Sequence, residues 1–314
     1  MEIEDLIGFL NNVDLEKLKV SLDELDKKVG DIVSRAESNI DSIIIDEIKG
    51  RDEKFFVWFC FLRGNFLRGR EIISNKAFAQ FIRFCRNQGN DLYFSKFPHS
   101  GDLLPRFQKP KFQRAGAIEE VLQQLRERYH SGREFIEEIE KLTGKIGIKE
   151  IHELYLSLIA KFMSFKQIGS KVANAILGEI SWEMTLLKRC NEKKTFQNLS
   201  KKELIRKLVL ASCFNVMIDT HVKNFFEEKL KIKDVEYSHL ILIAKSINPK
   251  TIHLLFERNF GWIKEKEFLL KNYKEYIGAN MIEKLIWVVY FVKKNSKADI
   301  SNLQFFKLRD NPFK

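Results

Sequence analysis

Two segments of the chain carry residue types that could do covalent chemistry. In 165–177, Lys171 follows Gly169 and Ser170 at the start of an apolar stripe that is typical of a helix. An amine is nucleophilic only when neutral, and burial or a neighbouring helix N-terminus favours the neutral form. In 213–223, Asp219 follows an apolar run and directly precedes a predicted helix. A carboxylate there can stabilise positive charge on a substrate, or it can serve only as the helix cap.

Helices are needed on both sides of Lys171 to hold it. The pattern predicts a helix over 149–163, a short turn that contains Gly169, and a second helix that begins near Ser170. Two helices joined by such a turn can direct backbone N–H groups at one phosphate, and the dipole of the second helix adds to the attraction. Lys171 could therefore be a nucleophile or only a phosphate-binding lysine.

The two segments together resemble the helix-hairpin-helix DNA glycosylase superfamily, which includes endonuclease III and the 8-oxoguanine glycosylases. Its hairpin reads Leu-Pro-Gly-(Val/Ile)-Gly-x-Lys-(Thr/x)-Ala, and Gly169, Lys171 and Ala173 match it. At its Leu, Pro, first Gly and Val positions, this chain has Phe165, Lys166, Gln167 and Ile168. The string from Ile218 to Val222 is similar to the family's Val-Asp-Thr-His-(Val/Ile).

Two departures from the family pattern stand out. Gln167 replaces the first hairpin glycine, which puts the turn geometry in doubt. Lys171 and Asp219 are 48 residues apart, further than in most of the superfamily. The additional residues indicate a helical insertion at about 181–210. A longer separation and an unorthodox hairpin are also seen in the archaeal 8-oxoguanine glycosylase branch, which this chain resembles more loosely.

The resemblance implies a bifunctional DNA glycosylase and AP lyase of base excision repair. Lys171 would form the Schiff base with the sugar, and Asp219 would be its electrostatic and proton-transfer partner. The substrate would be double-stranded DNA with a damaged base, with 8-oxoguanine favoured through the branch resemblance. The hairpin contacts to the DNA backbone would come from Lys166, Gln167, Ile168, Gly169 and Ser170. Amine and carboxylate chemistry requires no cofactor and no metal.

Other residues could contact a nucleotide that has been flipped out of the stack. The turn after a predicted central helix at 54–62 carries Arg63, Asn65 and Arg68, which could enter the gap left by the flipped base. A base pocket could include Trp182 and Trp287, and Trp262 is a further stacking candidate. Each tryptophan is also a candidate core residue.

Composition supports a helical protein. The 314 residues include 45% hydrophobic residues, which excludes a disordered chain, and only 15 Gly and 5 Pro, which argues against an all-β fold. We predict an all-α fold of two helical lobes with a helix-hairpin-helix motif at about 155–180 and a cleft between the lobes. Helices are expected at 117–141, 149–163, 171–188 and 202–212, and through 222–314 with short breaks.

The net charge of +11 is concentrated in two blocks. Residues 51–114 hold 13 Lys/Arg and 5 Asp/Glu, and residues 161–314 hold 29 and 16. Such fields attract nucleic acid, although a generally lysine-rich composition would give the same counts. We predict N-terminal helices at 1–60 that pack with the C-terminal lobe, a helical domain at 61–222, and the C-terminal lobe at 223–314.

The remaining expectations concern location and the competing function. The longest apolar run, 285–292, is too short to cross a bilayer, and the first five residues include three acidic and no basic ones, so we expect a cytoplasmic protein with no membrane contact. We also expect a monomer. In a prokaryote it would be associated with the nucleoid. The four cysteines have no metal-site spacing and are expected to be buried free thiols. The alternative function is a non-catalytic helical protein that grips the phosphate backbone of DNA or RNA through the hairpin.

Overall fold

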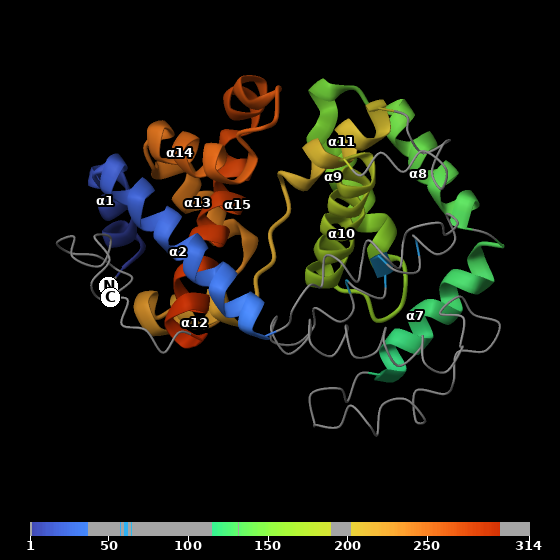
Figure 1. Cartoon of the computed structure of the whole chain (residues 1–314), viewed down its shortest axis with the longest axis horizontal. Helices are drawn as coiled ribbons and strands as arrows, with labels where there is room; N and C mark the ends of the chain where they lie inside the picture. Colours follow the sequence, from blue (N-terminus) through green and yellow to red (C-terminus); the bar gives the residue numbers. More distant parts are fainter. Residues whose placement is uncertain are drawn as a thin grey trace. The chain divides into compact units, whose positions relative to one another are not determined.

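The computed structural model describes residues 2–36, 115–130, 132–189 and 202–295, together with Val57, Cys60, Phe61 and Gly64. Every regular element in these ranges is a helix, which confirms the predicted all-α class (Figure 1). The chain divides into two compact units. Unit 1 consists of Met1–Arg35 and Val216–Lys314, and unit 2 consists of Ala36–Asn215.

Unit 1 is built around its longest helix, α15. Its described helices are α1 (Ile3–Asn12), α2 (Leu15–Ala36), α12 (Thr220–Leu230), α13 (Tyr237–Ser246), α14 (Pro249–Phe260) and α15 (Lys266–Asn295). Helix α15 packs against α12, α13 and α14, and the backbone departs from helical geometry at Tyr273 (Figure 1). Nearly all side chains over 277–292 are buried, including the polar Asn280 and Glu283, which explains the apolar run at 285–292.

Two sets of polar contacts join the N-terminal helices to α14. The Thr251 hydroxyl donates to the Leu10 carbonyl at 2.9 Å, and Asn11 both accepts from the Asn248 N–H at 2.6 Å and donates to the Ser246 carbonyl at 3.1 Å. Further along the same helices, Arg258 forms an ion pair with Asp26. The first residues of the chain are therefore an integral part of unit 1.

Unit 2 contains the predicted hairpin. Its described helices are α7 (Ala115–Arg128), α8 (Gly132–Lys145), the 3-10 helix η3 (Ile148–Glu150), α9 (Ile151–Met163), α10 (Ser170–Arg189) and α11 (Lys202–Ser212). Helix α10 packs against both α9 and α11, and α11 also contacts α8 and α9. The ring of Phe61 lies edge-on to those of Phe135, Phe162 and Phe165, with centroids 5.3–5.8 Å apart.

The prediction of one continuous helix over 117–141 is wrong. Helix α7 ends at Arg128, and α8 begins at Gly132, a residue with low helix propensity. At the break, the Glu134 carboxylate accepts from the His130 N–H at 2.9 Å, and the Tyr129 hydroxyl donates to Glu138 at 2.6 Å. Burial, together with this hydrogen bond to Glu138, raises the pKa of Tyr129.

The segment predicted as an insertion, 181–210, contributes to the core of unit 2. The described parts of α11 bury Leu204, Leu208 and Val209, and the Ser181 hydroxyl donates to the Leu208 carbonyl at 3.1 Å. Lys207 is 9% exposed, and its amine donates to the carbonyls of Thr143 and Ile146, both at 2.7 Å. A lysine thus satisfies carbonyls at the C-terminal end of α8.

Several smaller expectations can be compared with the described residues. Val57, Cys60 and Phe61 are helical and buried, as predicted for the central helix. Cys60 and Cys213 are buried free thiols. Trp262 is 54% exposed in the turn after α14, so its interpretation as a core residue is wrong. Among the described helices, none is both long and apolar enough to span a membrane.

Candidate functional site

The turn between α9 and α10 is held by two buried side chains. Phe165 is 1% exposed and Ile168 is 5% exposed, and the Ile168 N–H donates to the Phe165 carbonyl at 3.2 Å. Lys166, Gln167 and Gly169 lie between or beside these two residues and are exposed. Along the turn, buried residues that contact the core are therefore interspersed with residues that face solvent. Because the Ile168 side chain is buried, only its backbone could contact DNA.

Gln167 has an unusual backbone conformation for a residue with a side chain. Its φ is 70°, in the left-handed region that favours glycine. This is the position at which the resembling hairpin has its first glycine. The turn thus contains a left-handed residue even though the glycine is absent. The Gln167 amide donates to Glu120 of α7 at 2.9 Å, which helps to hold the conformation.

Two further residues of α7 fasten the same turn. Gln124 accepts from the backbone N–H of Lys166 at 2.8 Å and donates to its carbonyl at 3.5 Å. Arg128 donates to the hydroxyl and the carbonyl of Ser164, both at 2.8 Å, and its guanidinium lies 4.3 Å from the centre of the Phe165 ring. These supporting residues were not predicted from the sequence. Their spacing of four, which places them on one face of a helix, was the available signal.

The first turn of α10 presents N–H groups that have no acceptor among the residues that the structure describes. The first helical hydrogen bond runs from the Ala173 N–H to the Gly169 carbonyl at 3.0 Å. Gly169 therefore occupies the N-cap position, where it has no side chain to accept from the helix. No group in the described part of the chain accepts from the N–H of Ser170, Lys171 or Val172. A Cβ added at Gly169 would meet no atom of the described residues within 4 Å, so those residues leave the approach to these N–H groups open.

Lys171 extends from this helix end. It is half-buried, and its amine has neither a hydrogen bond nor an ion pair with any residue that the structure describes. Buried polar bonds fix the helix beneath it. Asn174 is 1% exposed, accepts from the Tyr155 hydroxyl at 3.0 Å and donates to the Ser170 carbonyl at 2.9 Å. Burial raises the pKa of Tyr155 to about 12, so this hydroxyl remains a donor.

The other wall of α10 lies against the central helix of unit 2. A Cβ added at Gly64 would stand 2.6 Å from a side-chain carbon of Ile176, so the two backbones approach too closely for any larger residue. This contact places the described end of the central helix beside α10. The adjacent candidates Arg63, Asn65 and Arg68 lie outside the described residues.

Asp219 opens α12 in unit 1. It is half-buried, and its Oδ1 accepts from the N–H of His221 at 2.8 Å and from that of Val222 at 3.1 Å. This is the capping geometry that the sequence allowed as its structural role. Its Oδ2 has no partner among the described residues, so one oxygen remains available for another group.

The tryptophan candidates have different surroundings. Trp287 is half-buried on α15, stacked on Phe291 with centroids 4.7 Å apart, and the ring of His221 lies 6.4 Å away, edge-on. Trp287 therefore lies in the same cluster as the first turn of α12. The backbone of Trp182 belongs to α10, and its side chain lies outside the described part. Lys171 belongs to unit 2, whereas Asp219 and Trp287 belong to unit 1.

Comparisons with family models, with curated proteins and with solved structures found no match to this chain. Within the described residues, no group of three or more His, Cys, Asp or Glu side chains could hold a metal ion. The functional interpretation therefore depends on the hairpin turn, the amine of Lys171 and the carboxylate of Asp219.

Proposed function

We propose that the protein is a bifunctional DNA glycosylase and AP lyase that acts on double-stranded DNA with a damaged base. In this proposal, α9, the turn and α10 act as a helix-hairpin-helix motif, and the two units act as lobes on either side of a DNA-binding cleft. Both strings of the superfamily resemblance, around Lys171 and around Asp219, support it.

The observation that carries the proposal is the first turn of α10. Three N–H groups and a lysine amine, none with a partner in the described part of the chain, occur beside a cap glycine on a turn that Phe165, Gln124 and Arg128 hold in place. A helix end of this kind binds a phosphate well, because its N–H groups and its dipole both attract an anion. A DNA backbone phosphate supplies that anion.

The chemistry would proceed in two stages. The neutral amine of Lys171 attacks the anomeric carbon of the flipped nucleotide, and the bond between the sugar and the base breaks, with the base taking the electron pair. The sugar ring then opens to a Schiff base, a proton leaves the adjacent carbon, and the 3′ phosphate departs by β-elimination. Asp219 would stabilise the positive charge that develops on the sugar and help to move protons.

The test is covalent capture. Borohydride reduces a Schiff base to a stable amine, so wild-type protein mixed with an abasic duplex should give an adduct of protein and DNA. Lys171→Gln should abolish the adduct. Lys166 is an exposed lysine of the same turn, and Lys166→Gln should weaken DNA binding but still form the adduct. An adduct that persists in Lys171→Gln would overturn the assignment of the nucleophile, and no adduct on any abasic or damaged duplex would overturn the activity.

The resemblance favours 8-oxoguanine as the damaged base, and a second experiment addresses this choice. A panel of duplexes, each with one lesion, should be assayed for base release and strand nicking. Faster release of 8-oxoguanine than of oxidised pyrimidines or uracil is the expected result. A preference for another lesion would support the glycosylase activity but show that 8-oxoguanine is not the preferred substrate.

A specific observation favours the alternative of a non-catalytic protein that grips DNA or RNA. Asp219 already has a complete structural role as the cap of α12, so its presence does not require catalysis. The alternative predicts binding of duplex DNA that depends on Lys166 and Lys171, with no adduct and no nicking. The borohydride experiment separates the two functions directly.

A further inference from the structure

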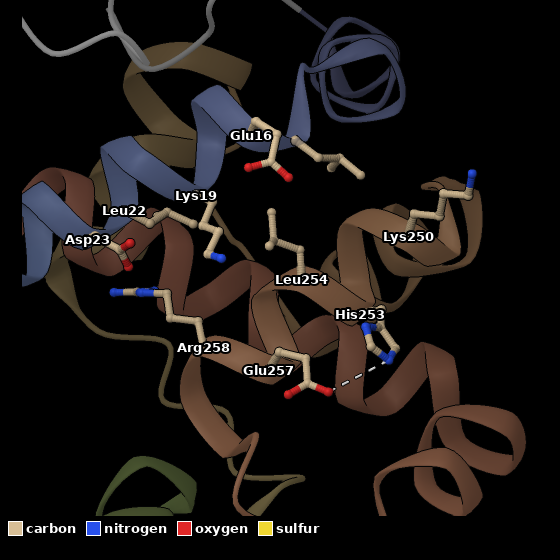
Figure 2. Close-up of a pocket in the computed structure, with 10 residues that line it drawn as sticks. Glu16, Lys19, Leu22, Asp23, Lys250, His253, Leu254, Glu257 and Arg258 are labelled. Atoms are coloured by element: carbon tan, nitrogen blue, oxygen red, sulfur yellow. Dashed lines mark ion pairs between the residues drawn. The ribbon is translucent and has the colours of Figure 1, made fainter.

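A hollow of about 600 Å³ lies between α2 and α14 in unit 1 (Figure 2). Residues spaced three to four apart on each helix line it, so each helix turns one face towards the hollow. The lining consists of Leu15, Glu16, Lys19, Leu22 and Asp23 from α2, and of Lys250, His253, Leu254, Glu257 and Arg258 from α14. Its volume is typical of sites for small molecules.

Helix α14 is fastened to α1 near its start and to α2 towards its end. At the start of α14, Thr251 and Asn248 are bonded to residues at the end of α1. Towards the end of α14, Arg258 forms an ion pair with Asp26 of α2, and the side chain of Arg258 is only 13% exposed. Because α14 is bonded to the N-terminal helices near both of its ends, the hollow is a feature of the folded unit.

The charged groups around the hollow fall into two sets. Arg258 is paired with Asp26, and Glu257 is paired with Lys266 and lies 3.8 Å from His253. By contrast, within the described part of the chain, the side chains of Glu16, Lys19 and Asp23 have no hydrogen bond or ion pair. Figure 2 shows Glu16 and Lys19 extending from α2 towards Leu254, whereas the amine of Lys250 points away from the hollow.

The unpaired groups indicate the charge of a ligand. Two carboxylates and one amine face the hollow, which disfavours a purely anionic ligand such as a nucleic-acid backbone. A ligand with one ammonium and one carboxylate would pair with both kinds of group. Leu15, Leu22 and Leu254 form an apolar surface between them, which suits an aliphatic body.

The spacing of the charged residues on α2 limits the length of the ligand. Lys19 and Asp23 are four residues apart on α2, which corresponds to a rise of about 6 Å along the helix. The two termini of an extended dipeptide are about 7 Å apart, since each residue spans at most roughly 3.5 Å. We propose that this hollow binds a short zwitterionic peptide with aliphatic side chains, its ammonium on Asp23 or Glu16 and its carboxylate on Lys19.

The proposal is tested by calorimetric titration of the full chain with leucyl-leucine. Saturable binding is expected, and N-acetyl-leucyl-leucinamide, which lacks both terminal charges, should not bind. Lys19→Met and Asp23→Asn should each weaken binding about tenfold, the usual effect of one lost charge-assisted bond. The matched controls Lys27→Met and Glu24→Gln, exposed on the same helix but away from the hollow, should change it less than about twofold.

Three outcomes would overturn the proposal. Leucyl-leucine could fail to bind saturably, the capped dipeptide could bind as well as the free one, or inorganic phosphate could compete for the same site. Circular dichroism of each variant should show an unchanged helical signal, because the substituted side chains are exposed. None of these results depends on the proposed glycosylase activity, since Lys171 and Asp219 do not line the hollow.

Discussion

The N-terminal ends of α10 and α12 carry the two candidate catalytic residues and differ in how their backbone groups are satisfied. At α12, the cap residue Asp219 accepts from two N–H groups of the first turn. At α10, the cap residue is Gly169, and three N–H groups of the first turn have no acceptor in the described part of the chain. One helix end is completed by its own sequence, and the other is left open.

This difference shows which candidate needs a function to explain it. A helix normally satisfies or hydrates its first N–H groups, and Ser, Thr, Asp or Asn at the cap does so at little cost. Gly169 forgoes that contribution, while Glu120, Gln124 and Arg128 hold the preceding turn firmly. The open end of α10 is thus well supported, yet no group in the described ranges of the chain accepts from it, which favours an external anion. The free energy of unfolding of selected variants, measured by chemical denaturation, tests this difference between the two helix ends.

The largest effect is expected for Lys207→Met, since this lysine is engaged where Lys171 is not. The substitution removes the charge-assisted bonds to the buried Thr143 carbonyl and to the partly buried Ile146 carbonyl, so it should destabilise the protein by about 3 kcal/mol. Arg206→Met is the matched control, because its exposed ion pair with Glu203 contributes at most about 0.5 kcal/mol. Similar losses in both variants would mean that the buried bonds of Lys207 contribute little.

The next effect tests whether Asp219 is more than a cap. Asp219→Ala should cost about 1 kcal/mol because the first turn of α12 loses its acceptor. Asp219→Asn should cost only a few tenths, because an asparagine oxygen caps a helix as well as a carboxylate does. Activity separates the roles, since catalysis requires the charge and capping does not. If Asp219→Asn formed the borohydride adduct at the wild-type rate, Asp219 would be a cap alone.

The sequence predicted much of the helical framework. Apolar spacing located α9, α10 and α11 to within a residue or two, since these helices bury one continuous stripe each. It failed at 129–130, after the end of α7, where the chain has no proline and the break depends on the side chains of Tyr129 and Glu134. Such contacts become visible only when two helices are packed together.

Within the candidate site, the sequence predicted the elements and missed their supports. The positions of Gly169 and Lys171 at the start of a helix followed from the turn and the apolar stripe. The left-handed conformation of Gln167 did not, because glutamine carries no preference for positive φ. It follows from bonds to α7, a helix more than 30 residues away in sequence.

Gln167→Gly tests the strain in the turn itself. A positive φ costs a residue with a side chain about 1 kcal/mol, and glycine avoids this cost. The variant also loses the hydrogen bond from Gln167 to Glu120, which opposes the gain. We expect a net stabilisation of about 0.5 kcal/mol. Lys166→Gly is the control, because its φ is not positive and glycine should destabilise it by roughly 0.5–1 kcal/mol. Destabilisation of equal size in both would show that Gln167 is not strained.

Lys171 is the residue whose substitution we expect to affect stability least and the proposed chemistry most. Lys171 has no partner among the described residues, so Lys171→Gln should change the free energy of unfolding by less than about 0.5 kcal/mol. Removal of a charge beside the positive end of the α10 dipole could even stabilise the helix slightly. This result would matter because a loss of the borohydride adduct in a fully stable variant cannot be attributed to unfolding. A destabilisation comparable to that of Lys207→Met would instead show that Lys171 is a structural lysine, and the contrast between the two helix ends would no longer support a catalytic role.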